Sequence, residues 1–230
     1  MTLTLAITYE QPERSGIILI ADKKTERFDE TTNTRRRTHE EKIFFDNTLA
    51  AAIEGQHILT IDEMQDCTPR QIIEQLIYHN QTFTIEPSST YSLFLARRTP
   101  QTVSLESRTK MPNEKEHTTY LVDISNGRTI ERATIYTHSF KGELATMTFN
   151  GGKSLERAVF LAALLNVHCR KTGNVSKEQT AIEITTRRIR PRTLRIKTNT
   201  KIRTLLRKKQ YMQPLLEQMT SDGIIEVASL

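Results

Sequence analysis

Short runs of aliphatic and β-branched residues alternate with polar segments along most of the chain, and this pattern predicts strands. Near the N-terminus, two such runs are joined by a polar connection that contains Pro12. A second pair flanks Asp46-Asn47, a dipeptide that favours a tight turn between antiparallel strands. The predicted strands cover residues 2–8, 16–21, 42–45, 48–53, 91–97, 102–108, 118–125, 128–137, 143–149, 180–186 and 224–228.

Three segments have the spacing of helices. Thr68 before Pro69 is typical of an N-cap followed by proline in the first turn, and apolar residues then recur at helical spacing to about residue 80. Residues 154–171 carry a broad apolar stripe that ends before Gly173. A third, basic helix is expected over 202–212. Residues 26–41 are charged, have no hydrophobic period, and are expected to form a loop.

This order of strands and helices predicts an α+β layered domain. The chain has 230 residues, of which 37% are hydrophobic, so it is long enough to bury a sizeable core. The pattern changes after Pro191, where basic residues become frequent. We therefore expect one domain over residues 1–190 and a basic C-terminal extension over residues 191–230.

Positive charge is concentrated near the C-terminus. The net charge is +6, but eleven Lys and Arg residues and no acidic residue lie in the segment from Arg187 to Lys209, which leaves a net negative charge on the rest. Such a segment could bind the phosphates of a nucleic acid. However, only Tyr211 nearby could stack on a base, and no RNP, KH or helix-turn-helix pattern occurs. We favour packing against an acidic surface of a neighbouring subunit.

The sequence also provides expectations for the cellular location of the protein and for its cofactors. The longest apolar run, Ala158–Leu165, is far shorter than the ~18 residues of a membrane span, and no signal-peptide core is evident. A cytoplasmic location without membrane contact is expected. Cys67 and Cys169 stand alone, and the histidines have no metal-ligand spacing. We therefore expect no metal and no organic cofactor.

Four features near the N-terminus follow one another in a defined order. Thr2 comes directly after the initiator methionine, and the apolar run 16–21 leads into Asp22. Lys42 precedes an Ile-Phe pair, and the strand predicted over 48–53 runs into Gly55. Each feature is common by itself, and the information lies in their order.

This ordered set resembles the opening of proteasome β-subunits and their bacterial and archaeal relatives, the N-terminal-nucleophile (Ntn) hydrolases. The resemblance covers about the first 55 residues and continues more weakly through Gly151-Gly152 and the following helix. It implies a four-layer αββα sandwich, with two sheets between helical layers, and a homo-oligomer. It also implies that Thr2 is the nucleophile, Asp22 orients the lysine, Lys42 is the electrostatic partner, and Gly55 supplies a backbone N–H to the oxyanion.

The implied chemistry is physically reasonable. A free α-amino group can accept the proton of the hydroxyl on the same threonine, because its pKa is about 7.7–8.0. A neighbouring ammonium such as that of Lys42 would lower this pKa by repulsion, and a carboxylate would hold the lysine in place. A backbone N–H at Gly55 could stabilise the oxyanion. Met1 must be removed, since an internal Thr2 has no free amine.

Several positions depart from the family pattern. Glu54 replaces a small residue beside Gly55, Gly152 stands where the family usually has serine, and residues 172–175 lack the usual Asp and Ser. The leading hypothesis is a threonine-type peptidase that acts on peptides or unfolded proteins. Peptide transfer is a second possibility, because connectases also begin with Met-Thr-Leu. The alternatives are a non-catalytic subunit of a proteasome-like assembly and a nucleic-acid-binding protein that uses Arg187–Lys209.

Overall fold

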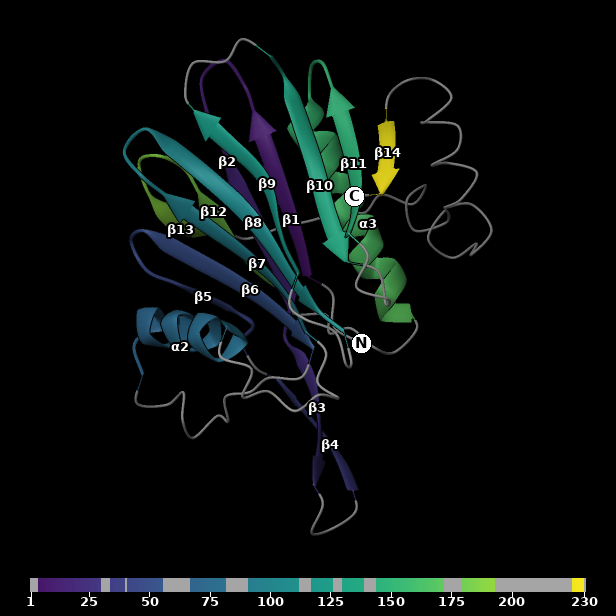
Figure 1. Ribbon diagram of the computed structural model, residues 1–230. Coiled ribbons are helices and arrows are strands. Elements are labelled where there is room, and N and C mark those ends of the chain that lie inside the picture. Colours follow the sequence, from purple (N-terminus) through teal and green to yellow (C-terminus); the bar gives the residue numbers. More distant parts are fainter. Residues whose placement is uncertain are drawn as a thin grey trace.

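The structure is a computed structural model of the chain. It describes residues 4–29, 34–39, 41–55, 67–81, 91–111, 117–125, 130–138, 144–171, 179–192 and 225–229, and all structural statements below concern these residues. Most of them lie in strands that form two antiparallel sheets stacked face to face (Figure 1). A separate two-stranded hairpin projects from one end of this sandwich.

The larger sheet has seven strands in the order β13-β12-β2-β1-β10-β11-β14. Each neighbouring pair is antiparallel. Its strands are β1 (Thr4–Glu10), β2 (Ser15–Asp22), β10 (Arg132–His138), β11 (Leu144–Asn150), β12 (Gln179–Ile184), β13 (Ile189–Arg192) and β14 (Ile225–Ser229). The C-terminal strand β14 therefore completes one edge of the main sheet, beside β11.

The smaller sheet has five strands in the order β5-β6-β7-β8-β9, so each strand pairs with its neighbour along the chain. Its strands are β5 (Ile43–Phe45), β6 (Leu49–Gly55), β7 (Tyr91–Arg98), β8 (Thr102–Lys110) and β9 (His117–Ser125). A bulge between Leu105 and Glu106 shifts the register of β8 against β9.

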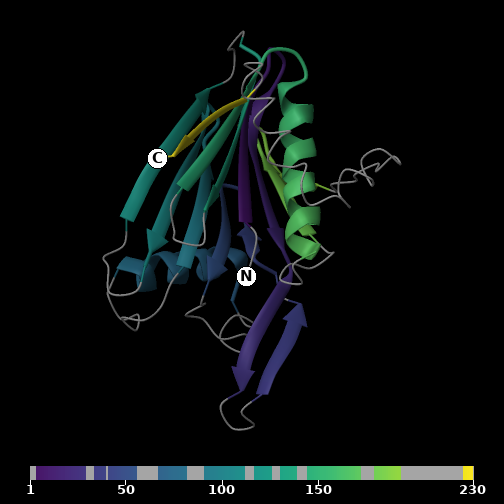
Figure 2. The same ribbon diagram turned by 90° about the vertical axis from the view of Figure 1, so that its right-hand side faces the viewer.

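In the described part of the chain, one helix lies on the outer face of each sheet. Helix α3 (Ser154–Lys171) packs on β1, β10 and β11 of the larger sheet, and α2 (Pro69–Gln81) packs on β5 and β6 of the smaller sheet (Figure 2). Each helix covers a separate apolar cluster, and a third cluster lies between the sheets. Strand β2 is buried along its whole length, because Ile17 and Leu19 face the smaller sheet while Ile18 and Ile20 face α3.

The expected four-layer αββα sandwich of the α+β class is wrong. The described part of the chain is mostly β, with two antiparallel sheets and one short helix on each outer face. The basic helix expected over 202–212 lies outside the described residues. The resemblance implied a layer of helices on each side of the two sheets. In the described residues each outer face carries one helix, and the Thr- and Ile-rich segments form strands.

The segment expected to be a loop also forms strands. Residues 24–39 contain β3 (Lys24–Asp29) and β4 (Thr34–His39), paired antiparallel with Lys24 opposite His39. This hairpin extends away from both sheets (Figure 2). The segment has no hydrophobic period, and a hairpin outside the two sheets does not require one, because alternation is imposed where one face of a strand is buried against a core.

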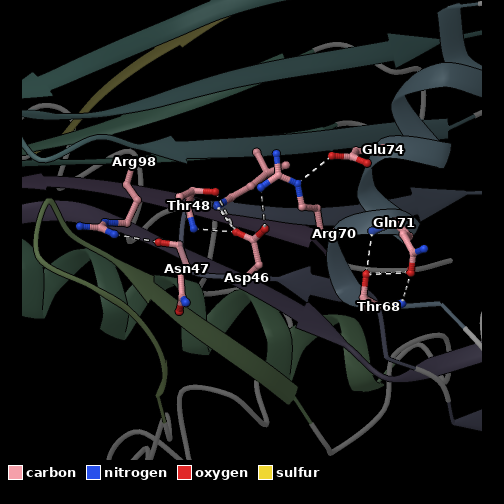
Figure 3. A network of polar contacts seen from close by, with 9 residues as sticks. Asp46, Asn47, Thr48, Thr68, Arg70, Gln71, Glu74 and Arg98 are labelled. Atoms are coloured by element: carbon pink, nitrogen blue, oxygen red, sulfur yellow. Dashed lines mark hydrogen bonds and ion pairs between the residues drawn. The ribbon is translucent and has the colours of Figure 1, made fainter.

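The turn between β5 and β6 is fixed by Asp46. Its Oδ1 accepts hydrogen bonds from the backbone N–H groups of Thr48 and Leu49, at 2.6 and 2.9 Å (Figure 3). Burial alone would raise the pKa of Asp46, but these hydrogen bonds and the nearby Arg70 charge lower it below its usual value. At the start of α2, Thr68 and Gln71 form a reciprocal capping box (Figure 3).

Arg98 joins the two sheets at their ends. Its Nη1 donates to the carbonyl oxygen of Asn47, at 2.8 Å, in the β5–β6 turn (Figure 3). Its Nε donates to the carbonyl oxygen of Thr185, at 3.1 Å, and its Nη2 donates to that of Thr186. One guanidinium therefore satisfies carbonyls of two turns that belong to different sheets.

Candidate active site

A buried ion pair lies where β2 ends and β5 begins. Lys42 Nζ is 3.1 Å from Asp22 Oδ1, and both side chains are at most 1% exposed. Asp22 is the last residue of β2, and Lys42 directly precedes β5, where its carbonyl accepts a hydrogen bond from Ile53 N–H. Buried charges are costly unless they are paired, so this site depends on both partners.

Glu54 and Thr4 extend this charged cluster. Thr4 Oγ1 donates a hydrogen bond of 2.7 Å to Glu54 Oε2, which links the first residue of β1 to β6. The pKa of Glu54 is raised, mainly because it is buried, and the charge of Asp22 adds to this effect. The hydrogen bonds from Thr4 and the positive charge of Lys42 act in the opposite direction. A carboxyl with a raised pKa can exchange a proton closer to neutral pH.

The structure brings together two of the four residues singled out in the sequence. Asp22 and Lys42 are in contact, as the resemblance implies. Gly55 follows Glu54 as the last residue of β6, with Tyr91 opposite it in the ladder. Thr2 lies outside the described residues, which begin at Thr4. The catalytic roles of all four residues stay predictions.

Sequence reasoning missed a buried serine–histidine contact between the sheets. Ser107 Oγ lies 2.6 Å from His138 Nε2, and the His138 ring stacks on Phe94 with centroids 4.4 Å apart. Burial lowers the pKa of His138 to about 4, so its ring is neutral near physiological pH. No sequence signal could have shown this contact, because the two residues are 31 positions apart on strands of different sheets.

This contact lacks the third group of a catalytic triad. His138 Nδ1 is buried, and no described residue bonds to it. A base that activates serine is normally oriented through this second ring nitrogen. Ser107 is also only 2% exposed. We interpret the pair as a hydrogen bond that satisfies polar groups inside the sandwich.

Two further features bear on the class of site. No helix in the described ranges is long and apolar enough to cross a membrane. Across the same ranges, no three His, Cys, Asp or Glu side chains converge as metal ligands would. The chain matches no protein-family model and no curated protein sequence.

Proposed function

We propose that the chain is a threonine-type peptide hydrolase, or a peptide-transferring enzyme, that uses Thr2 after removal of Met1. The single observation that supports this most strongly is the buried Lys42–Asp22 pair, next to the strand that leads from the N-terminus. Thr2 precedes Thr4 by two positions in the sequence, and Thr4 hydrogen-bonds to Glu54 of the cluster.

The proposed mechanism assigns one task to each group. The α-amine of Thr2 accepts the proton of its own hydroxyl, and the oxygen attacks the peptide carbonyl. The peptide C–N bond then breaks, the α-ammonium group returns the proton to the departing amine, and a threonyl ester remains. Lys42, oriented by Asp22, keeps the amine neutral by charge repulsion. The N–H of Gly55 donates to the oxyanion. Water then releases the peptide as an acid, or the amine of a second peptide accepts the acyl group.

We infer a peptide or an unfolded protein as the substrate, the cytoplasm as the location, and self-association into a homo-oligomer. The mechanism uses only groups of the chain itself.

One observation favours a non-catalytic subunit instead. Glu54 precedes Gly55 in β6 and accepts the hydrogen bond of Thr4, so a carboxyl group lies one residue away from the proposed oxyanion donor. A negative charge there would oppose the reaction. The raised pKa of Glu54 reduces this conflict, because a protonated carboxyl carries no charge. Nucleic-acid binding through Arg187–Lys209 falls mainly on residues outside the described ranges and also stays a prediction.

The decisive test is covalent labelling of the processed protein. Intact mass and N-terminal sequencing should show Met1 removed and Thr2 unblocked. A peptide epoxyketone or β-lactone should then add one equivalent at Thr2, and Thr2→Ala should prevent this. Thr118→Ala, at an exposed position of β9 outside the charged cluster, serves as the matched control that still reacts. Quantitative retention of Met1, or labelling that survives Thr2→Ala, would overturn the proposal.

A further inference from the structure

A cleft of about 480 Å³ lies at the end of the sandwich remote from the Lys42–Asp22 pair. One wall is formed by the turn between β1 and β2, which contributes Arg14, and by Ser15 at the start of β2. The other wall is the turn between β12 and β13, which contributes Arg187 and Arg188. Thr4, at the opposite end of β1, belongs to the candidate active site, so the two sites are separated by the length of that strand.

The floor of the cleft contains an already compensated carboxylate. Glu183 Oε2 lies 2.8 Å from Arg190 Nη2 and 2.7 Å from Arg192 Nη2, and its Oε1 accepts a hydrogen bond from Tyr9. Burial alone would raise the pKa of Glu183, but the hydrogen bonds from Arg192, Tyr9 and Arg190 lower it. Glu183 therefore stays ionised and needs no further cation.

Three more guanidinium groups border the cleft. Arg187 and Arg188 are exposed, and in the part of the chain that the structure describes no side chain pairs with either of them. Arg14 lies over the ring of Tyr9, with its guanidinium carbon 5.8 Å from the ring centroid, and donates from Nε to Gln11. Glu13 is the one other acidic residue in the lining, so positive charge is in excess.

One residue in the lining of the cleft is a buried serine. Ser15 lines the cleft and is 3% exposed, and its hydroxyl bonds to no described group. A buried hydroxyl without a partner costs stability, so natural proteins rarely keep one without a reason. An acceptor oxygen of a bound ligand would provide the missing hydrogen bond.

The arginine-bearing turn is held in place without a ligand. Thr185 Oγ1 donates to the carbonyl of Arg188, at 3.1 Å, and the carbonyls of Thr185 and Thr186 accept hydrogen bonds from Arg98. The wall that presents Arg187 and Arg188 is therefore built into the fold. A preformed turn reduces the entropy that ligand binding must overcome.

We infer that this cleft binds the phosphate group of a small molecule. Guanidinium forks match the geometry and the double charge of phosphate, and a serine hydroxyl can donate to one of its oxygens. The volume lies within the range of small-molecule sites, roughly 300–1,000 Å³. The concave shape between two turns favours a compact ligand over an extended nucleic-acid strand. This binding is independent of the proposed peptide chemistry at the other end of the sandwich.

Calorimetric titration of the full chain with pyrophosphate tests the inference. Ionic strength is held at about 0.15 M with sodium chloride, because salt at this concentration screens non-specific electrostatic attraction. We expect submillimolar affinity for the unmodified chain and at least about tenfold weaker binding for the Arg187→Gln/Arg188→Gln variant. Ser15→Ala should weaken binding several-fold while leaving thermal stability unchanged or higher, since it removes a hydroxyl without a partner.

Arg157→Gln is the matched control, because Arg157 is an exposed arginine on α3, outside the cleft lining. It should bind pyrophosphate within about twofold of the unmodified chain. Acetate at equal ionic strength should compete poorly, which distinguishes phosphate from carboxylate ligands. A dissociation constant for pyrophosphate weaker than about 10 mM, which corresponds to about 3 kcal/mol of binding free energy, would overturn the inference. An equal loss of affinity in Arg157→Gln, or a preference for a short oligonucleotide, would also overturn it.

Discussion

Tyr9 donates a hydrogen bond of 2.8 Å to Glu183 and thereby joins β1 to β12 across the intervening strand β2. The residue of β2 opposite Tyr9 is Gly16, which has no side chain to block the tyrosine ring. A Cβ built on Gly16 would lie 2.9 Å from the Tyr9 hydroxyl oxygen and 2.4 Å from the carbonyl oxygen of Ile184. The contact between Tyr9 and Glu183 therefore depends on this glycine.

Gly16→Ala should destabilise the protein by about 2–3 kcal/mol, because a backbone carbonyl cannot move away from the new methyl group. Denaturant unfolding monitored by circular dichroism measures this change. Gly152→Ala is the matched control: its Cβ would lie 3.7 Å from a Glu131 carboxylate oxygen, so it should change stability by less than about 0.5 kcal/mol. Equal stabilities of the two variants would contradict the close approach at Gly16.

Arg98→Lys should lower the free energy of unfolding by roughly 1–3 kcal/mol. The planar guanidinium donates to three carbonyl oxygens in two turns, and a single ammonium cannot reproduce that geometry. Arg97→Lys, the exposed neighbour on β7, is the control and should be nearly neutral. If both variants unfold at the same denaturant concentration, Arg98 does not link the sheets energetically.

We expect the folded protein to lose stability in mild acid because of His138. Its folded-state pKa is about 4, below the ordinary value of 6.5, because the ring is buried. Between these values the unfolded chain binds the proton that the folded chain excludes. Stability contributed by the neutral ring is therefore complete above pH 6.5 and declines as pH falls towards 4, by up to roughly 3 kcal/mol.

Chemical denaturation from pH 7.5 to 4 measures this effect. His138→Gln should reduce the pH dependence, because glutamine cannot take up a proton. His117→Gln, at an exposed position of β9, should leave the pH profile unchanged. A His138→Gln profile parallel to that of the unmodified chain would show that His138 does not control acid stability.

The Lys42–Asp22 pair allows stability and chemistry to be separated. Lys42→Met should lower the free energy of unfolding by roughly 3–5 kcal/mol, because it removes the positive charge next to a buried carboxylate. Adding Asp22→Asn should recover a large part of this loss, since no unpaired charge then remains. The double variant should nevertheless fail to form the Thr2 adduct, because the lysine charge is absent. Adduct formation at the normal rate would remove Lys42 from the mechanism.

Lys42→Arg is a second check on the same pair. It keeps the charge, but the guanidinium is larger and differently shaped, so we expect no recovery of labelling at Thr2. Near-normal labelling in this variant would show that only the charge at this position matters.

Several elements could be predicted from the sequence because local patterns specify them. The helix expected over 68–80 is α2, Pro69–Gln81, and the helix expected over 154–171 is α3, Ser154–Lys171. The turn at Asp46-Asn47 is confirmed, with Asp46 bonded to the following backbone. Capping residues, apolar periodicity and turn residues act over a few positions, so a single sequence contains this information.

The fold class and the position of the C-terminal strand could not be obtained in this way. Residues 26–41 carry no alternation, yet residues 26–29 and 34–39 lie in the paired strands β3 and β4, and β14 pairs with β11 from the far end of the chain. Strand pairing depends on partners distant in sequence, and many pairings are compatible with one hydrophobic pattern. The implied αββα layers failed for the same reason, since resemblance near the N-terminus does not determine how the remainder packs.

The sequence by itself determined the local elements and, through the resemblance, suggested the pairing of Asp22 with Lys42. Tertiary structure decided what surrounds them: Thr4 and Glu54 joined the charged cluster, and Glu183 met Tyr9 across another strand. The cleft between two distant turns likewise exists only in the folded chain. The physical reason is that burial and charge compensation depend on which distant residues meet, and a periodic pattern along one strand does not encode that meeting.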